Sequence, residues 1–233
     1  MYSKSIDIYS DGIGRVDYVN HMGDDLTVVN AARVSFGVEK EEIDGRDKKL
    51  ISYLIKHRHT STLEHNLITF RFSVPLYVRS QHHRHRTWSY NEISRRYTDV
   101  DIKFYEPKEF RTQHKSNRQA SNAEELIDPR GMPYALPRAS LIVQEHHKTS
   151  LKLFNDLIEA GVCREQASGV LPQNLYTEYY GTVNLSNLLK FIDLRTHEGA
   201  QWEIVKVAEA CLEIATDLFP ETVGAYRRIR KEK

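Results

Sequence analysis

Arg79-Ser-Gln-His-His-Arg-His-Arg-Thr-Trp-Ser-Tyr-Asn-Glu-Ile-Ser-Arg-Arg-Tyr97 is the most unusual stretch of the chain, and the interpretation of the rest depends on it. Its only carboxylate is Glu92, whereas the formal net charge of the whole protein is +1. The basic residues of the stretch are Arg79, His82, His83, Arg84, His85, Arg86, Arg95 and Arg96. Such a local excess of positive charge indicates an anionic partner.

The residue types in this stretch suggest what that partner is. Guanidinium groups bind phosphate through paired hydrogen bonds, and neutral polar side chains suit sugar hydroxyls or a base edge. The neutral polar residues are Gln81, Ser89, Asn91 and Ser94. Trp88, Tyr90, Ile93 and Tyr97 alternate with the charges and favour burial, which argues against a merely solvated basic face. The pattern favours a phosphorylated small molecule with a polar heterocycle.

Two other chemistries compete with this interpretation. The histidines could supply zinc ligands, but Arg84 and Arg86 lie between them and would repel a divalent cation. Aromatic residues among basic ones also suit stacking on single-stranded nucleic acid. The nearly neutral chain and the short basic run disfavour a groove that follows a nucleic-acid backbone. We therefore expect no metal and no nucleic-acid partner.

Composition sets the class of protein. With 233 residues and 40% hydrophobic content, the chain can bury a full core, and we expect one domain spanning 1–233. The first residues lack an apolar signal segment, and no run approaches the roughly 18 apolar residues of a membrane span. The two cysteines, Cys163 and Cys211, do not form a disulfide framework. We expect a cytoplasmic protein without membrane contact.

Periodicity predicts alternating strands and helices before residue 106. Strands are expected at 6–10, 14–20, 66–74 and 102–105, and helices at 25–34, at 48–57 and from Pro75 into the basic stretch. The charged segment 38–47 is expected to be solvated. Ser61-x-x-Glu64 has the form of a capping box, which could be only a helix start or could present N–H groups to a ligand.

Later in the chain the pattern becomes mainly helical. Residues 107–138 are irregular and proline-rich, with a short helical turn suggested at 124–127. Helices are expected at 139–160, at 185–194 after the cap Asn184, and at 200–219 before Pro220, and an aromatic strand at 173–184. The basic tail 227–233 is expected to fray.

The pattern Arg-His-Arg-x-x-Ser-x-Asn-Glu-x-Ser-x-Arg-Tyr, filled at every fixed position from Arg84 to Tyr97, resembles the signature of the flavin-dependent thymidylate synthases. Further segments resemble the same family and extend the likeness over most of the chain. They are 171–177, Asn184-x-Ser186, Arg195 and 200–204. The resemblance is weakest across 107–138.

The resemblance implies a fold and a reaction. The fold would be α+β, with a central mostly antiparallel sheet flanked by helices, in a homotetramer whose active sites are shared between subunits. The reaction would convert dUMP to dTMP, with methylenetetrahydrofolate as carbon donor and FAD, reduced by NADPH, as hydride source. Tetrahydrofolate would be released. The cofactor would carry the redox chemistry, while the protein positions rings and stabilises charge.

The resemblance also implies roles for individual residues. Arg195 would be catalytic, facing the uracil and stabilising negative charge that develops at N3 and the neighbouring carbonyl. The flavin would contact His59, Ser61, Arg84, His85, Arg86, Thr87, Glu92, Asn184, Leu185, Ser186 and Lys190. The substrate dUMP would contact Gln81, His82, His83, Arg84, Glu92, Ile93, Ser94, Arg95, Arg96, Ser168 and Arg195.

Three positions depart from the family pattern. Ser168 stands where the family usually has a dUMP-binding arginine, and a shorter, uncharged side chain implies weaker binding or another basic residue in its place. Gly199 occupies a position that is often histidine, and Lys190 one that is asparagine in some members.

Overall fold

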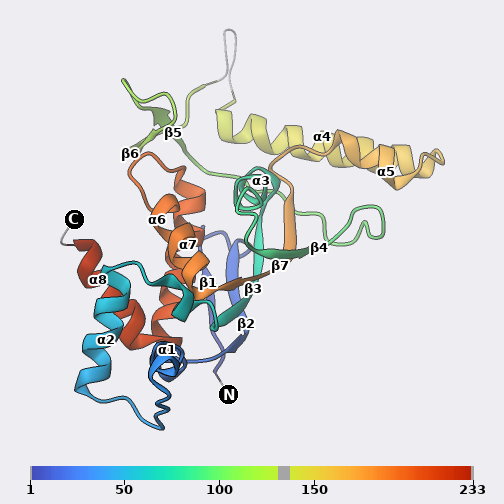
Figure 1. Cartoon of the computed structure of the whole chain (residues 1–233). Helices are drawn as coiled ribbons and strands as arrows, with labels where there is room; N and C mark the ends of the chain where they lie inside the picture. The colour runs from blue at the N-terminus through green and yellow to red at the C-terminus, as the bar shows by residue number, and fades with distance from the viewer. Residues whose placement is uncertain (1, 131–136, 232–233) are drawn as a thin grey trace.

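A five-stranded antiparallel sheet forms the centre of the computed structural model, which describes residues 2–130 and 137–231 (Figure 1). The spatial order is β1 (Ser5–Asp7), β2 (Arg15–Met22), β3 (Leu67–Pro75), β7 (Tyr176–Asn184) and β4 (Ser89–Glu92). Every neighbouring pair is antiparallel. The prediction of an α+β fold with a mainly antiparallel sheet is therefore confirmed.

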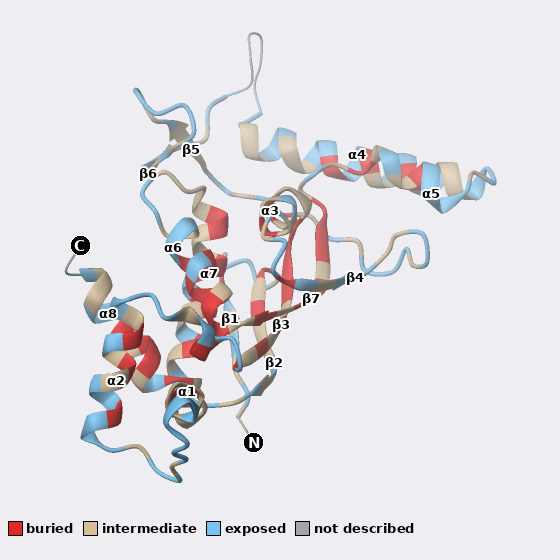
Figure 2. Cartoon of the chain, in the orientation of Figure 1, coloured by how far each residue is buried: buried red, intermediate tan, exposed pale blue. Residues whose placement is uncertain are grey.

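The alternation of side chains on β3 gives the sheet one apolar and one polar face. Phe70 and Phe72 are fully buried in the main core, whereas Arg71 lies on the opposite face and pairs with Glu178 of β7. Successive strand residues point to opposite faces, so the sequence pattern sets this division. Figure 2 shows the buried residues concentrated along the sheet and the helices beside it.

The described part of the chain contains eight α-helices. They are α1 (Asp25–Arg33), α2 (Gly45–Lys56), α3 (Leu76–His82), α4 (Ala139–Glu159), α5 (Arg164–Ala167), α6 (Leu185–Arg195), α7 (Trp202–Leu218) and α8 (Pro220–Lys231). Helices α6 and α7 supply the apolar side chains that meet the sheet, for example Phe191 and Val207. No helix among residues 2–130 and 137–231 is long and apolar enough to cross a membrane.

Helices α4 and α5 project from the body and have a small core of their own (Figure 1). Phe154 of α4 packs there with Leu171 and Leu175. The buried imidazole of His147 stacks on Phe104, and its Nδ1 lies 2.9 Å from a carboxylate oxygen of Glu106. These contacts join the projecting pair of helices to the segment that follows the basic stretch.

Helix boundaries agree with the sequence patterns where the capping residue directly precedes the helix. Asp24 caps α1, and Asn184 caps α6 by accepting from the backbone N–H of Asn187 at 2.9 Å. The capping box predicted at Ser61 and Glu64 is wrong, because 60–63 forms a 3-10 turn without a side-chain cap. Pro75 ends β3, and α3 begins one residue later than predicted.

Several segments differ from the sequence-based expectation. Residues 124–127 belong to β6 (Ser121–Ile127), which pairs with β5 (Phe110–Gln113) in a hairpin, so the helical turn predicted there is wrong. Only one isolated bridge, Phe104 to Leu175, forms in the predicted strand 102–105. Residues 227–231 of the predicted frayed tail are helical and belong to α8, which Val223 and Tyr226 anchor in the main core, whereas 232–233 lie outside the described residues.

A buried carboxylate in α1 fixes the start of α8. Asp25 is 5% exposed, and it accepts hydrogen bonds from the backbone N–H groups of Glu221 at 2.8 Å and Thr222 at 2.9 Å. The Thr222 hydroxyl donates to the same carboxylate at 2.5 Å. This cap lies nearly two hundred residues away in the sequence from the helix it completes.

We expect Asp25→Ala to lower the free energy of unfolding by about 2–3 kcal/mol, because two helix-end N–H groups and a buried hydroxyl lose their acceptor. Chemical denaturation monitored by circular dichroism measures this difference. Asp101→Asn, at an exposed residue that pairs with Lys103, is the control and should change stability by less than about 0.5 kcal/mol. Equal stability of the two variants would contradict the assigned cap.

Candidate active site

The C-terminal ends of α3 and α6 meet around the guanidinium of Arg195. Its Nε donates to Nε2 of His85 at 3.0 Å, and its Nη2 donates to the backbone carbonyl of Gln81 at 3.2 Å. Among the described residues Nη1 has no hydrogen-bond partner, and the side chain is partly buried. Burial lowers the pKa of Arg195 from its ordinary value, but a guanidinium remains charged in proteins. The arginine is therefore fixed at two positions and free to donate at a third.

The histidines beside Arg195 are neutral. Burial, reinforced by the charge of Arg195, lowers the pKa of His85 to about 4. Because Nε2 of His85 accepts from Arg195, the ring proton lies on Nδ1. Burial also holds the pKa of His82 well below its usual range, and His82 Nδ1 lies 2.9 Å from the hydroxyl of Tyr179. The positive charge of this stretch is consequently carried by its arginines.

Aromatic packing holds the turn between α3 and β4 against the sheet. The indole of Trp88 is buried and lies edge-on to His82, with ring centroids 4.5 Å apart. Gly181 of β7 leaves room for Phe72 and Trp88, because a Cβ there would lie 2.8 Å from Phe72 and 3.3 Å from Trp88. His83 stacks on Tyr90, with ring centroids 4.1 Å apart. The alternation of aromatic and basic residues thus separates a packed side from a polar side.

Glu92, the single carboxylate of the stretch, lies at the end of β4 and is already paired. It accepts from the hydroxyl of Thr177 at 2.7 Å, and one carboxylate oxygen lies 3.1 Å from Nε of Arg79. Both partners come from neighbouring elements of the same chain. Glu92 is only partly buried, so a ligand can still reach its remaining lone pairs.

The residues after β4 line a separate cavity on the polar face of the sheet. It measures about 350 Å³ and includes Ile93, Arg95 and the cations Arg15 and Arg71. Arg95 donates to the backbone carbonyl of Val100 at 2.9 Å. The hydroxyl of Ser94 accepts from the backbone N–H of Arg96, whose exposed side chain lies 3.4 Å from Glu165 of α5.

Residues at the start of α6 line a third region. A cavity of about 590 Å³ is bounded by Ser186 and Lys190 of α6, together with Arg58 and Arg230. The side chain of Ser186 is 2% exposed, and its hydroxyl has no hydrogen-bond partner among the described residues. His59 and Ser61 border an adjacent cavity of about 480 Å³. Leu185 is buried in the core, and its backbone N–H donates to the carbonyl of Asn66 at 2.9 Å.

The other predicted residues are exposed or lie elsewhere. Arg84, Arg86 and Thr87 are exposed in the turn before β4. Ser168 follows α5, where its hydroxyl donates to the backbone carbonyl of Glu165 at 3.2 Å. The nearest arginine in sequence, Arg164, pairs with Asp99 at 3.1 Å. The structure thus brings together Gln81, His82, His83, His85 and Arg195, while the remaining predicted residues occupy other cavities or surfaces.

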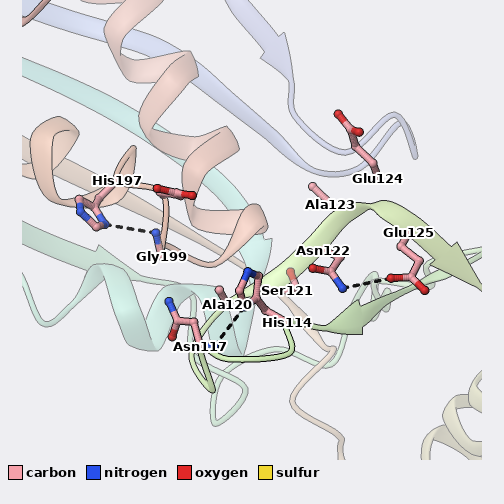
Figure 3. A pocket seen from close by; sticks show the side chains of 11 residues that line it. His114, Asn117, Ala120, Ser121, Asn122, Ala123, Glu124, Glu125, His197 and Gly199 are labelled. Carbon is pink, nitrogen blue, oxygen red and sulfur yellow. Dashed lines mark hydrogen bonds between the residues drawn. The ribbon is translucent and has the colours of Figure 1, made fainter.

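The cavity between the β5–β6 hairpin and the loop joining α6 to α7 contains none of the predicted site residues (Figure 3). It measures about 690 Å³ and is lined by polar side chains, including His114, Asn117 and His197. A Cβ at Gly199 would lie 3.4 Å from the amide of Asn117, so a larger residue at this position would meet the hairpin. Sequence reasoning missed the hairpin because its strands lack an apolar face.

Metal-ligand geometry is not evident in the described ranges 2–130 and 137–231. No group of three histidine, cysteine, aspartate or glutamate side chains there is arranged to hold an ion. Within the basic stretch, His82 bonds Tyr179, His83 stacks on Tyr90, and His85 accepts from Arg195. The imidazoles thus serve packing and orientation.

Comparison with known proteins tests the family resemblance. The model of a family described as "Thymidylate synthase complementing protein" matches residues 17–221. The flavin-dependent thymidylate synthase of Thermus thermophilus is 42% identical over 213 residues, which cover 91% of this chain and 75% of that protein. The enzyme of Thermotoga neapolitana is 38% identical over 213 residues, which cover 91% of this chain and 90% of that protein.

A solved structure resembles the chain in its fold as well. The UMP/dUMP methylase PolB of Streptomyces cacaoi, in a crystal structure with bound 5-Br dUMP, has a TM-score of 0.77 and 32% sequence identity. The match covers 96% of this chain and 97% of that one. Because the family model, the sequence relatives and the fold agree over most of the chain, the resemblance predicted from 84–97 is confirmed. The protein belongs to the flavin-dependent thymidylate synthase family.

Proposed function

We propose that the chain converts dUMP to dTMP, using methylenetetrahydrofolate as carbon donor and FAD reduced by NADPH, and that it releases tetrahydrofolate. The relatives that carry the name flavin-dependent thymidylate synthase cover nearly the whole chain. The observation that carries the proposal is the fixed guanidinium of Arg195, whose Nη1 donors point to no residue of the described chain. When bound, FAD supplies the hydride that completes the methyl group.

Arg195 has the properties that this reaction needs beside the uracil. C5 of the uracil must act as a nucleophile to take up the methylene carbon, and it does so more readily when negative charge develops on the N3 and carbonyl region of the base. A preorganised cation stabilises such charge without reorganising during the reaction. The neutral His85 orients the guanidinium by accepting its Nε–H, which an imidazolium could not do because it has no free lone pair.

The residues at the start of α6 fit a bound FAD. The buried hydroxyl of Ser186 lacks a partner among the described residues, and Lys190, Arg58 and Arg230 border the same cavity. A donor and several cations suit the pyrophosphate of a dinucleotide. Asn184 uses its carbonyl oxygen as the helix cap, which leaves its NH₂ group available to the cofactor.

The phosphate and sugar of dUMP would be held by Ser94, Arg95 and Arg96, with Gln81 and Glu92 nearer the base and sugar. Arg95 and Glu92 line different cavities in one chain. We propose that residues 1–233 work as one domain in a homotetramer, in which neighbouring subunits complete each active site. We also expect the protein to act in the cytoplasm, without a nucleic-acid or membrane partner.

A spectrum of the purified protein supplemented with FAD tests the proposal. We expect a bound-flavin band that bleaches with NADPH, and formation of dTMP from dUMP only when methylenetetrahydrofolate is also present. UMP is the matched substrate control, because PolB is described as acting on both nucleotides. Failure to bind FAD in excess, or reduction without any dTMP, would contradict the proposal.

Arg195→Lys should lower kcat by about 10²-fold or more while leaving the melting temperature and FAD binding unchanged. Lysine keeps the charge but cannot bond His85 and Gln81 and still present a third donor. Steady-state kinetics of dTMP formation measure the loss. Arg227→Lys, on the exposed surface of α8, should match the unaltered protein. Unchanged turnover of Arg195→Lys would refute the assigned role.

A further inference from the structure

Glu203, in the first turn of α7, is a buried carboxylate for which the proposed reaction has no use. It is 3% exposed, and one oxygen accepts from Nη2 of Arg111 at 2.6 Å. The other oxygen accepts from the side-chain amide of Gln201 at 3.0 Å. Arg111 also lies over the ring of Trp202, with 5.1 Å from its Cζ to the ring centroid. Glu203 is thus paired and rigidly held.

This carboxylate determines which way the neighbouring amide points. A carboxylate only accepts hydrogen bonds, so Gln201 must turn its NH₂ group toward Glu203. The carbonyl oxygen of Gln201 then faces the other way and accepts from the NH₂ group of Gln81. With its NH₂ group engaged, Gln81 has its own carbonyl oxygen Oε1 left to offer. Glu203 thus fixes the orientation of the Gln201 amide, which in turn fixes the orientation of the Gln81 amide.

Gln81 lies where a nucleotide base is expected. Its backbone carbonyl accepts from Nη2 of Arg195, so its side chain leaves α3 at the same helix end as the catalytic guanidinium. Gln81 is partly buried, and no described residue hydrogen-bonds its Oε1. An acceptor next to the site selects a ligand that presents a donor.

We propose that Glu203 is a positioning residue which, through Gln201, fixes Gln81 with its carbonyl oxygen toward the nucleotide, so that the site selects a hydrogen-bond donor there. This inference rests on the proposed function. In a uridine nucleotide the donor is either N3–H of the base or a sugar hydroxyl. Cytosine carries an acceptor at N3, so Gln81 would disfavour cytidine nucleotides if it faces the base.

Binding selectivity tests the inference on the FAD-saturated protein. Calorimetry gives the Kd values of dUMP, of dCMP and of 2′,3′-dideoxyuridine monophosphate for the unaltered protein, Glu203→Gln and Gln201→Met. Without a fixed amide, Gln81 can turn its NH₂ group to the ligand, so we expect the preference for dUMP over dCMP to fall about tenfold in both variants. If the sugar hydroxyl is the donor, the preference for dUMP over the dideoxy analogue should fall instead.

The double variant should lose no more selectivity than the worse single variant, because both act on the same amide. Glu209→Gln, at an exposed position of α7 that pairs with Lys206, is the control and should keep both preferences. Should Glu203→Gln fail to fold, Gln201→Met still carries the test, since it retains the pair between Glu203 and Arg111. Unchanged preferences in the folded variants would overturn the inference. An unaltered protein that does not bind dUMP would instead overturn the proposed function.

Discussion

The hydrogen bond from Arg195 to a neutral His85 is the interaction on which the site depends. It requires that His85 stay unprotonated beside a permanent cation, and partial burial against Phe191 supplies that condition. The same burial keeps His82 neutral. The sequence of this stretch suggests a high positive charge, but His82 and His85 are uncharged rings held in fixed orientations. The arginines are left to meet an anionic ligand, and this arrangement lets so many basic residues follow one another without severe repulsion.

The predicted site residues lie in three separate parts of one chain. The end of α3 and the end of α6 form one part, the segment after β4 forms a second, and the start of α6 forms a third. The second and third parts line separate cavities. The reaction proposed here, between a nucleotide, a flavin and a folate, needs these parts close together. We propose that assembly of several subunits brings them together.

Local patterns predicted much of the fold. The alternation of β3 and the Asn184 cap of α6 are present as expected, because both depend on neighbouring residues. Long-range contacts were harder to predict. The cap of α8 by Asp25, the hydrogen bond from Arg195 to His85 and the burial of Glu203 each join residues distant in sequence. For the same reason, the family signature predicted candidate site residues but did not indicate how they are oriented.

Complementation between two inactive variants tests the shared site most directly. Arg195→Lys alters the part at the ends of α3 and α6, whereas Arg96→Gln alters the segment after β4. If neighbouring subunits contribute these parts to one site, oligomers that contain both variants should form dTMP faster than either variant alone, because some sites receive two intact parts. If mixed oligomers form and activity stays at the level of the separate variants, both parts come from one chain, and the account of a shared site is wrong.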